Sequence, residues 1–136
     1  MYARVSYLLL VLTSVILLSS CQEKKADFFE RDAREYTEKY CPQPCGDGIT
    51  TLDSIVYEKE GVGTLKMFYS LTMTDAEHEK MMNVLGELGD ANLSILRSSV
   101  ILAKHKEAGM DFKYIYYDTN HGGKVAEYHF TKKDYE

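Results

Sequence analysis

The spacing of apolar residues predicts a helix followed by a strand hairpin in the first half of the folded chain. Apolar side chains recur every three or four residues over residues 24–40, as on one face of a helix. This face would carry Phe29, Ala33, Tyr36 and Tyr40. Pro42 ends the helix, because proline disfavours helical geometry in the residue before it. Segments 52–58 and 64–72 are rich in β-branched and aromatic residues and flank a glycine turn at 61–63, which predicts two antiparallel strands.

The second half of the chain repeats this order of elements. Residues 74–77 (Thr-Asp-Ala-Glu) form a capping-box sequence, in which the hydroxyl and the carboxylate each accept a backbone N–H at the start of a helix. The apolar stripe of the helix that follows would be Met81, Val84, Leu85 and Leu88. We expect a break near Gly89, because glycine weakens a helix, and then a further helix that ends at Gly109. Strands 111–118 and 124–130 predict a second hairpin.

A shift of the sequence by 60 residues aligns the two hairpins with each other. The matched pairs include Ile55 with Ile115, Tyr57 with Tyr117 and Gly63 with Gly123. Neither αββ unit can bury its sheet alone, so the two units should pair. We therefore predict a single α+β domain over residues 27–136, in which tandem αββ units form one antiparallel four-stranded sheet with helices packed on one face.

Strand alternation assigns the residues to the two faces of this sheet. The helix-covered face would hold Leu52, Val56, Phe112, Tyr114 and Tyr116. The opposite face would hold the candidate partner-binding residues Ile55, Tyr57, Phe68, Ile115 and Tyr117. Tyr128 would join this second set or, if the last strand is shifted by one residue, face the helices with Ala126 and Phe130. An exposed apolar patch of this kind marks a partner site; alternatively, the first helix or a loop covers it.

The residues before the folded part have the pattern of a secretory signal. A basic residue precedes an apolar run over residues 5–18, which is shorter than the about 20 residues that span a membrane. The run ends in Leu18-Ser19-Ser20-Cys21, which resembles the lipobox of bacterial lipoproteins. The resemblance implies cleavage before Cys21 and lipidation of this cysteine. It also implies an envelope location, at the outer membrane in a cell with two membranes, because Gln22 rather than Asp follows the cysteine.

The net charge argues against nucleic acid as a partner. The chain has 16 basic and 21 acidic side chains, a net charge of −5 at neutral pH. Removal of residues 1–20 takes away only one of these charges, Arg4, and leaves 116 residues (136 − 20) with a net charge of −6. Nucleic-acid binding rests on basic patches, and an acidic domain is not attracted to anionic lipid. Membrane attachment would therefore depend on the lipid at Cys21, with residues 21–26 as a tether.

Cys41 and Cys45 are the two remaining cysteines. Outside the cytoplasm such a neighbouring pair predicts a disulfide, which would close the end of the first helix. The alternatives are redox exchange or metal capture through the same pair, or two free thiols. Redox motifs, however, usually place two residues between the cysteines rather than three, and the sequence offers no second cysteine pair or spaced histidine pair to complete a metal site. We therefore predict no metal site and no cofactor.

The end of the chain has a recognisable order of features. A glycine at 109 precedes Tyr-rich strand residues 114–117, the turn Gly122-Gly123 and a closing Thr-Lys-x-Asp at residues 131–134. This order resembles small secreted bacterial proteins of unknown function, which implies a fold and no activity. No catalytic motif is present in the sequence.

We therefore predict a lipid-anchored envelope protein that acts as a non-enzymatic binding or structural module for a protein partner. The alternatives are an envelope redox or metal-binding protein acting through Cys41 and Cys45, and a carrier of lipid or another small ligand.

Overall fold

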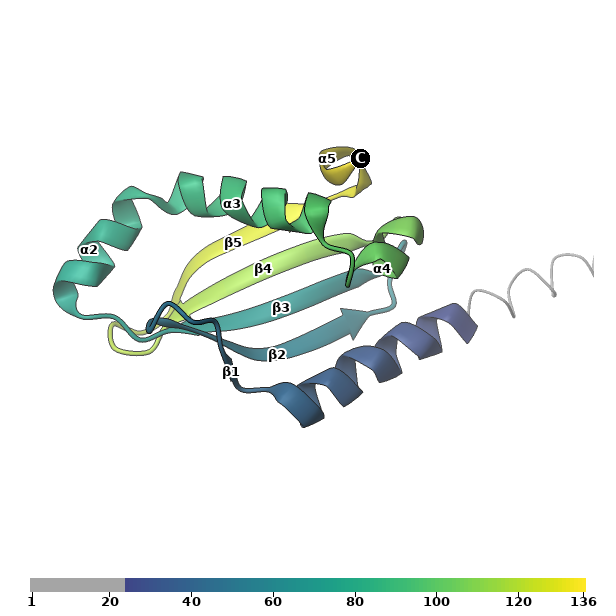
Figure 1. Cartoon of the computed structure of the whole chain (residues 1–136), viewed down its shortest axis with the longest axis horizontal. Coiled ribbons are helices and arrows are strands. Elements are labelled where there is room, and N and C mark those ends of the chain that lie inside the picture. The colour runs from purple at the N-terminus through teal and green to yellow at the C-terminus, as the bar shows by residue number, and fades with distance from the viewer. Residues whose placement is uncertain (1–23) are drawn as a thin grey trace, which may run out of the picture.

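A five-stranded sheet with helices on one face makes up residues 24–136, the part of the chain that the computed structural model describes (Figure 1). The predicted signal and Cys21 lie outside the described residues. The first helix spans residues 24–40. The later elements are β1 (Gln43–Pro44), β2 (Thr50–Glu58), β3 (Thr64–Leu71), α2 (Asp75–Asn83), α3 (Leu85–Ser98), α4 (Ala103–Glu107), β4 (Asp111–Asp118), β5 (Lys124–Phe130) and α5 (Lys132–Tyr135). Both predicted hairpins are present, and β1 and α5 are additions to the predicted order.

The sheet is mixed rather than antiparallel. Its strands are ordered β1-β2-β3-β4-β5, and every neighbouring pair is antiparallel except β3 and β4, which are parallel. The connection between these two strands runs through α2, α3 and α4, which cross back along the sheet (Figure 1). Such a connection returns the chain to the end at which β3 began, so β4 starts there in the same direction. The predicted α+β class is confirmed, whereas the predicted four-stranded antiparallel sheet was wrong.

Strand β2 contains a bulge at Asp53, where its pairing with β3 shifts by one residue. The extra residue reverses the alternation of side chains after it. Ile55 and Tyr57 therefore point to the helix-covered face, where their partners on β3 belong to the buried core. The prediction that Ile55 and Tyr57 lie on the opposite face was wrong, and so was the placement of Val56 towards the helices.

Strand β5 has the shifted register that the sequence left open. Tyr128 pairs with Tyr114 and packs against the core, so both lie on the helix-covered face. Phe68 pairs laterally with Ile115 in the parallel ladder, and both lie on the opposite face together with Tyr117, as predicted. Simple alternation therefore predicts the faces of the β4 side chains correctly, because that strand has no bulge before Tyr117.

The helical connection breaks at a different residue from the one expected. The capping box opens α2 as predicted, since the Thr74 N–H donates to Glu77 Oε2 at 2.8 Å and the Glu77 N–H donates to Thr74 Oγ1 at 3.3 Å. The break falls at Val84, and Gly89 is buried inside α3. A second break over residues 99–102 separates α3 from α4, so the predicted single helix up to Gly109 was wrong. A Cβ atom at Gly89 would lie 2.7 Å from Cε1 of the Tyr128 ring, so this glycine allows α3 to approach β5 closely.

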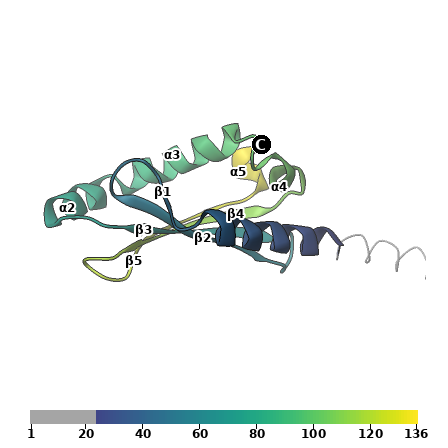
Figure 2. The same cartoon turned by 60° about the horizontal axis from the view of Figure 1, so that its bottom comes forward.

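Helices α2, α3, α4 and α5 lie on the same side of the sheet (Figure 2). The core between these layers consists of Leu52, Leu65, Met67, Leu71, Met73, Leu96, Met110, Phe112, Tyr114, Tyr116 and Tyr135, with Phe29 and Ala33 from the first helix. No helix within residues 24–136 is both long and apolar enough to cross a membrane.

Candidate functional site: an apolar groove between two helices

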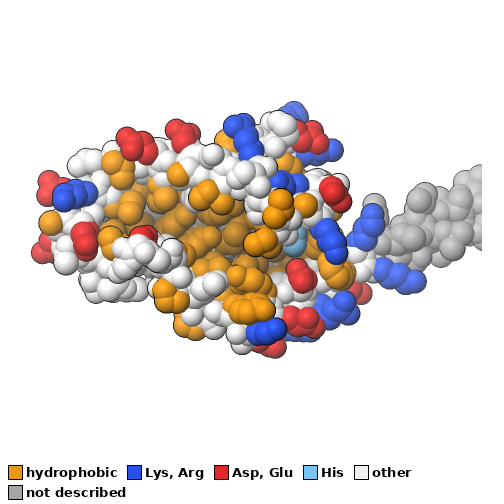
Figure 3. Space-filling model, viewed as in Figure 1, with side chains coloured by type: hydrophobic (Ala, Val, Ile, Leu, Met, Phe, Trp, Pro, Cys, Tyr) orange, Lys and Arg blue, Asp and Glu red, His pale blue; other side chains and the backbone are white. Residues whose placement is uncertain are grey.

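The helices leave a strip of the sheet open between them (Figures 1 and 3). Helix α3 lies over β4 and β5, where the Asn92 amide donates to the Tyr116 hydroxyl at 2.9 Å. The first helix lies instead along the outer edge of β2. There Thr37 Oγ1 accepts the Ile55 N–H at 2.9 Å and donates to the Ile55 carbonyl at 3.0 Å. These bonds satisfy backbone groups of β2 beyond the two residues that pair with β1. The face of β2 and β3 between the two helices is therefore covered only in part: Ile55 and Tyr69 are half-buried there, whereas Leu65, Met67 and Leu71 are at most 5% exposed.

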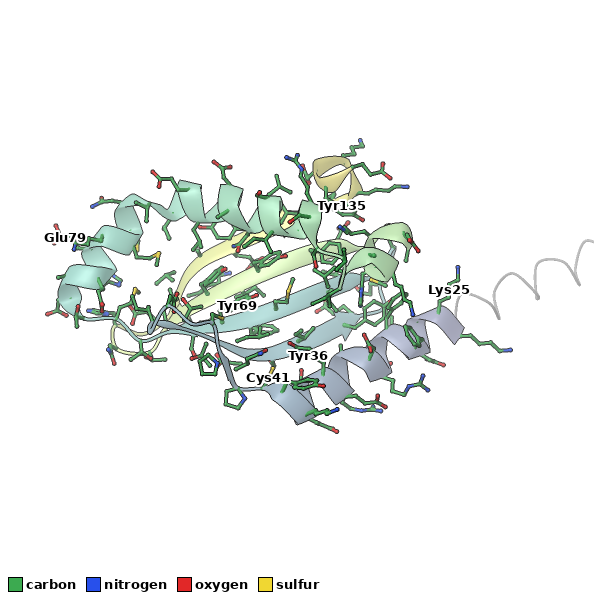
Figure 4. All side chains as sticks on the ribbon, in the orientation of Figure 1. Lys25, Tyr36, Cys41, Tyr69, Glu79 and Tyr135 are labelled. Carbon is green, nitrogen blue, oxygen red and sulfur yellow. The ribbon has the colours of Figure 1, made fainter. Side chains whose placement is uncertain are left out.

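This open strip is apolar and recessed. Figure 3 shows a continuous area of hydrophobic side chains that lies deeper than the helices on either side. We name it the interhelical groove. On the elements that border it, Tyr36 of the first helix, Ile55 of β2, Tyr69 of β3 and Leu88 of α3 are partly exposed, and Ile95 of α3 is exposed. Figure 4 shows Tyr36 and Tyr69 in this strip, on the helix and on the sheet respectively.

Tyrosine rings form the floor of the groove. The ring of Tyr69 stacks on that of Tyr116, with centroids 4.8 Å apart, and lies parallel to that of Tyr114 at 6.3 Å. Burial raises the pKa of all three hydroxyls, in the case of Tyr116 to about 12, so the floor is uncharged at neutral pH. The Tyr69 hydroxyl contacts only the Met67 sulfur, at 4.0 Å, among its hydrogen-bond partners within the described residues. Because sulfur is a weak acceptor, this hydroxyl is available to another molecule.

One rim of the groove is an apolar stripe on α3. Asn92 points to the sheet. Leu88 lies four residues before Asn92 and Ile95 lies three residues after it, so all three side chains are on the same side of the helix. The Ile95 side chain is nevertheless 62% exposed. Together with the apolar strip beside it, this exposed side chain forms part of a contiguous apolar patch, which is the kind of surface that marks an interaction site.

The dimensions of the groove suit a single α-helix. Neighbouring strands lie about 4.8 Å apart. The strip spans β2 and β3, so it is on the order of two such spacings wide, or about 10 Å. An α-helix with its side chains is about 10–12 Å in diameter.

The candidate partner-binding residues predicted from the sequence are divided between the two faces of the sheet. Ile55 lies in the groove, and Tyr57 lies on the same face near Phe29, with ring centroids 5.9 Å apart. The other three residues, Phe68, Ile115 and Tyr117, lie on the opposite face. That face is mixed in character, because Ile115 is only 5% exposed and salt-bridged lysine and glutamate side chains share it. A role of these five residues in partner binding stays a prediction.

Cys41 and Cys45 are free thiols, so the predicted disulfide is absent. The two residues of β1 lie between them in an extended conformation and pair with β2, Gln43 opposite Leu52. Each extended residue advances the chain by about 3.3 Å, and a disulfide requires Cα atoms within about 7 Å. Burial raises the pKa of both thiols, and nearby carboxylates act in the same direction. The thiolate that redox exchange needs is therefore disfavoured.

Sequence reasoning missed Tyr36, Tyr69, Leu88 and Ile95 as site residues. Three of them had been assigned to apolar helix faces or strands, but nothing in their spacing showed that the two helices stand apart. The distance between helices depends on where α3 crosses β5, which in turn depends on the close approach at Gly89.

Comparison with known proteins places the chain in a family and finds its fold in two solved structures. Residues 24–126 match the family described as a domain of unknown function (DUF8479). No curated protein matches the chain. A crystal structure of a candidate secreted protein from Pseudomonas aeruginosa is similar, with a TM-score of 0.67, 15% identity, and coverage of 85% of this chain and 96% of that one. EpsS, a pilotin from the type 2 secretion system of Vibrio vulnificus, has a TM-score of 0.66, 14% identity, and coverage of 86% of this chain and 97% of that one. At these identities the likeness shows a shared fold.

Proposed function

Because the chain belongs to the DUF8479 family, a domain of unknown function, we propose a function from the interhelical groove itself. The protein is a lipid-anchored, non-enzymatic component of the cell envelope that holds an amphipathic α-helix of a partner protein in this groove. The observation that carries the proposal is the recessed apolar strip between the first helix and α3 (Figure 3).

The chemistry of the groove supports a helical protein segment as the occupant. An amphipathic helix buries its apolar face in a groove through side chains at intervals of three and four residues. Tyrosines are enriched among the residues that dominate binding energy, and Tyr36 and Tyr69 stand on one rim and on the floor (Figure 4). The Tyr69 hydroxyl can then donate to a polar group of the partner.

The envelope location rests on two supports. The lipobox-like Leu18-Ser19-Ser20-Cys21 predicts lipidation of Cys21, and the fold is similar to those of a pilotin and a candidate secreted protein. Since the first helix already includes Lys24, only two residues separate it from Cys21. The domain would therefore lie close to the bilayer, and the partner would be another component of the envelope, as a pilotin is of its secretion system.

The experiment compares two aspartate substitutions at equally exposed positions. Ile95 in the groove and Val62 in the β2–β3 turn are both 62% exposed. Ile95→Asp should reduce co-purification of the partner from detergent-solubilised envelopes at least about tenfold, which corresponds to about 1.4 kcal/mol, because it puts a charge into an apolar interface. Val62→Asp should leave the co-purification of the partner unchanged. Equal retention of the partner by both variants, with both folded by circular dichroism, would refute the proposal.

A carrier of lipid or a small ligand is the second candidate function. A separate hollow of about 540 Å³ lies at the start of the first helix and is lined by Phe29, Tyr57, Val62 and Met110 among others. Its volume is in the range of small-molecule sites. Native mass spectrometry of the purified protein should show a bound lipid if this hollow is the functional site, and no bound lipid if the groove is.

A further inference from the structure

A cluster of two histidines and a buried carboxylate joins α2 to the turn that follows β4. His78 Nδ1 and His121 Nδ1 approach the same atom, Oδ2 of Asp118, at 2.7 and 2.9 Å. The two imidazole rings stack with centroids 4.2 Å apart. One ligand atom from each of the three side chains lies within 4.8 Å of the other two. We propose that His78, Asp118 and His121 bind one divalent transition-metal ion, such as Zn²⁺.

Asp118 is built as a fixed ligand. Its side chain is 0% exposed, and its Oδ1 accepts the backbone N–H groups of Asn120 at 2.9 Å and His121 at 3.0 Å. These two bonds orient the carboxylate and leave Oδ2 directed at the imidazoles. The buried oxygen is therefore held in place before an ion arrives, which lowers the cost of ordering the site.

His121 has the outer partner that metal-binding histidines usually have. Its second ring nitrogen, Nε2, lies 2.8 Å from Asp75 Oδ1 at the start of α2. Such a carboxylate accepts the free N–H of a ligating imidazole, fixes its tautomer and raises its basicity. Asp75 is thus a positioning residue. The two carboxylates, Asp75 and Asp118, also balance the charge of a divalent cation when both histidines are neutral.

The arrangement of His121 is unfavourable without a cation between the groups. A neutral imidazole carries one N–H, but carboxylate oxygens stand at both nitrogens of His121. At one of the two contacts, the lone pair of the unprotonated ring nitrogen would then face a lone pair of the carboxylate oxygen. A metal ion between Nδ1 and Asp118 Oδ2 removes this conflict, and a second proton on the ring is the competing solution.

The spacing of the ligand atoms is close to what a metal ion requires. Ligand atoms about 2.1 Å from an ion lie about 3 Å apart at right angles and about 3.4 Å apart in the tetrahedral geometry of Zn²⁺. The 2.7 and 2.9 Å between the imidazoles and Asp118 are shorter, so an ion would push the side chains apart by about 0.5 Å. The His78 and His121 side chains are 29% and 28% exposed, so the remaining coordination positions open to water. Imidazole ligands favour Zn²⁺, Cu²⁺ or Ni²⁺ over Mg²⁺ or Ca²⁺.

The site departs from the sequence expectation of no metal site. His78 and Asp118 are 40 residues apart, and only the crossover through α2, α3 and α4 brings them together. The cluster is independent of the groove. An ion there would fasten α2 to the end of the sheet.

The test measures Zn²⁺ binding by titration calorimetry. The full chain, untagged and carrying Cys41→Ser and Cys45→Ser so that thiols do not contribute, is purified in detergent, stripped with a chelator and titrated with ZnCl₂ at pH 7.5. We expect one ion per chain. His78→Gln and His121→Gln should each weaken binding at least about tenfold, and Asp75→Asn about tenfold, as loss of an outer partner does. His129→Gln is the matched control, because His129 also contacts a carboxylate, Asp111, at 2.8 Å but outside the cluster.

A second readout does not depend on variants. In the unsubstituted cluster, the ¹⁵N resonances of the His78 and His121 rings should shift on addition of Zn²⁺, whereas those of His129 should not. Absence of stoichiometric Zn²⁺ binding, or binding that both glutamine variants retain, would overturn the proposal. Ring nitrogens that respond to pH but not to Zn²⁺ would show that a proton occupies the cluster instead, and would overturn it as well.

Discussion

Replacing Gly89 with alanine adds one methyl group at the point where α3 crosses β5. On helix propensity alone the change should stabilise the protein by about 1 kcal/mol, because glycine is the poorer helix former. The new Cβ, however, would lie 2.7 and 2.8 Å from two carbon atoms of the Tyr128 ring. Overpacking of this kind costs about 1–3 kcal/mol.

The tyrosine ring cannot yield freely, since its hydroxyl donates to the Leu85 carbonyl. Loss of that hydrogen bond would cost about 1 kcal/mol more. The clash and the lost hydrogen bond therefore outweigh the propensity gain, and we expect Gly89→Ala to lower the free energy of unfolding by about 1–3 kcal/mol.

Gly86→Ala is the matched control. Gly86 belongs to the same helix, and an added Cβ there would meet no atom within 4 Å. It should raise the free energy of unfolding by up to about 1 kcal/mol. Urea unfolding followed by circular dichroism measures both effects. In a protein that already carries Tyr128→Ala, Gly89→Ala should destabilise much less than it does in the unsubstituted protein, because the clashing ring is gone. Stabilisation by Gly89→Ala equal to that of Gly86→Ala would refute the claim that this glycine sets the distance between α3 and the sheet.

Three further predictions concern a buried hydrogen bond, the cysteine pair and a buried histidine. Tyr116→Phe should cost about 1–3 kcal/mol because it leaves the Asn92 amide buried without its partner, whereas Tyr116→Phe with Asn92→Leu should recover part of this loss in urea titrations. Thiol titration of the unfolded, unreduced domain should detect both Cys41 and Cys45, and a non-reactive pair would show that they form a disulfide after all. Burial lowers the pKa of His105 from its usual 6.5, so its contribution to stability should be complete above about pH 6.5 and be lost as the pH falls through the lower pKa of the folded state. His105→Leu should therefore flatten the decline in thermal stability between about pH 7 and pH 5, and an unchanged slope would contradict this assignment.

Local elements were predictable because short signals specify them. The capping box at Thr74 and Glu77, the glycine turn before β3 and the strand composition of β4 and β5 each act over a few residues. The bulge at Asp53 has no such signal, and one extra residue was enough to move Ile55 and Tyr57 to the other face. The similarity between the two hairpins likewise does not indicate whether β3 and β4 pair in a parallel or an antiparallel arrangement.

The candidate sites were less predictable because they join distant segments. The groove depends on the separation of the first helix from α3, and the histidine cluster joins α2 to the turn after β4. The cysteine pair, in contrast, was conspicuous in the sequence. Its predicted disulfide is absent because β1 holds the intervening residues extended against β2.

Site-specific photocrosslinking in living cells tests the central claim most directly. A photoreactive amino acid is placed at Ile95 in the groove or at Tyr117 on the opposite face, both of which are exposed, and the crosslinked partner peptide is identified by mass spectrometry. We predict an adduct from position 95 and none from position 117, with apolar residues of the peptide spaced three and four apart. An adduct from position 117 with none from position 95 would contradict the groove and return the binding site to the opposite face of the sheet.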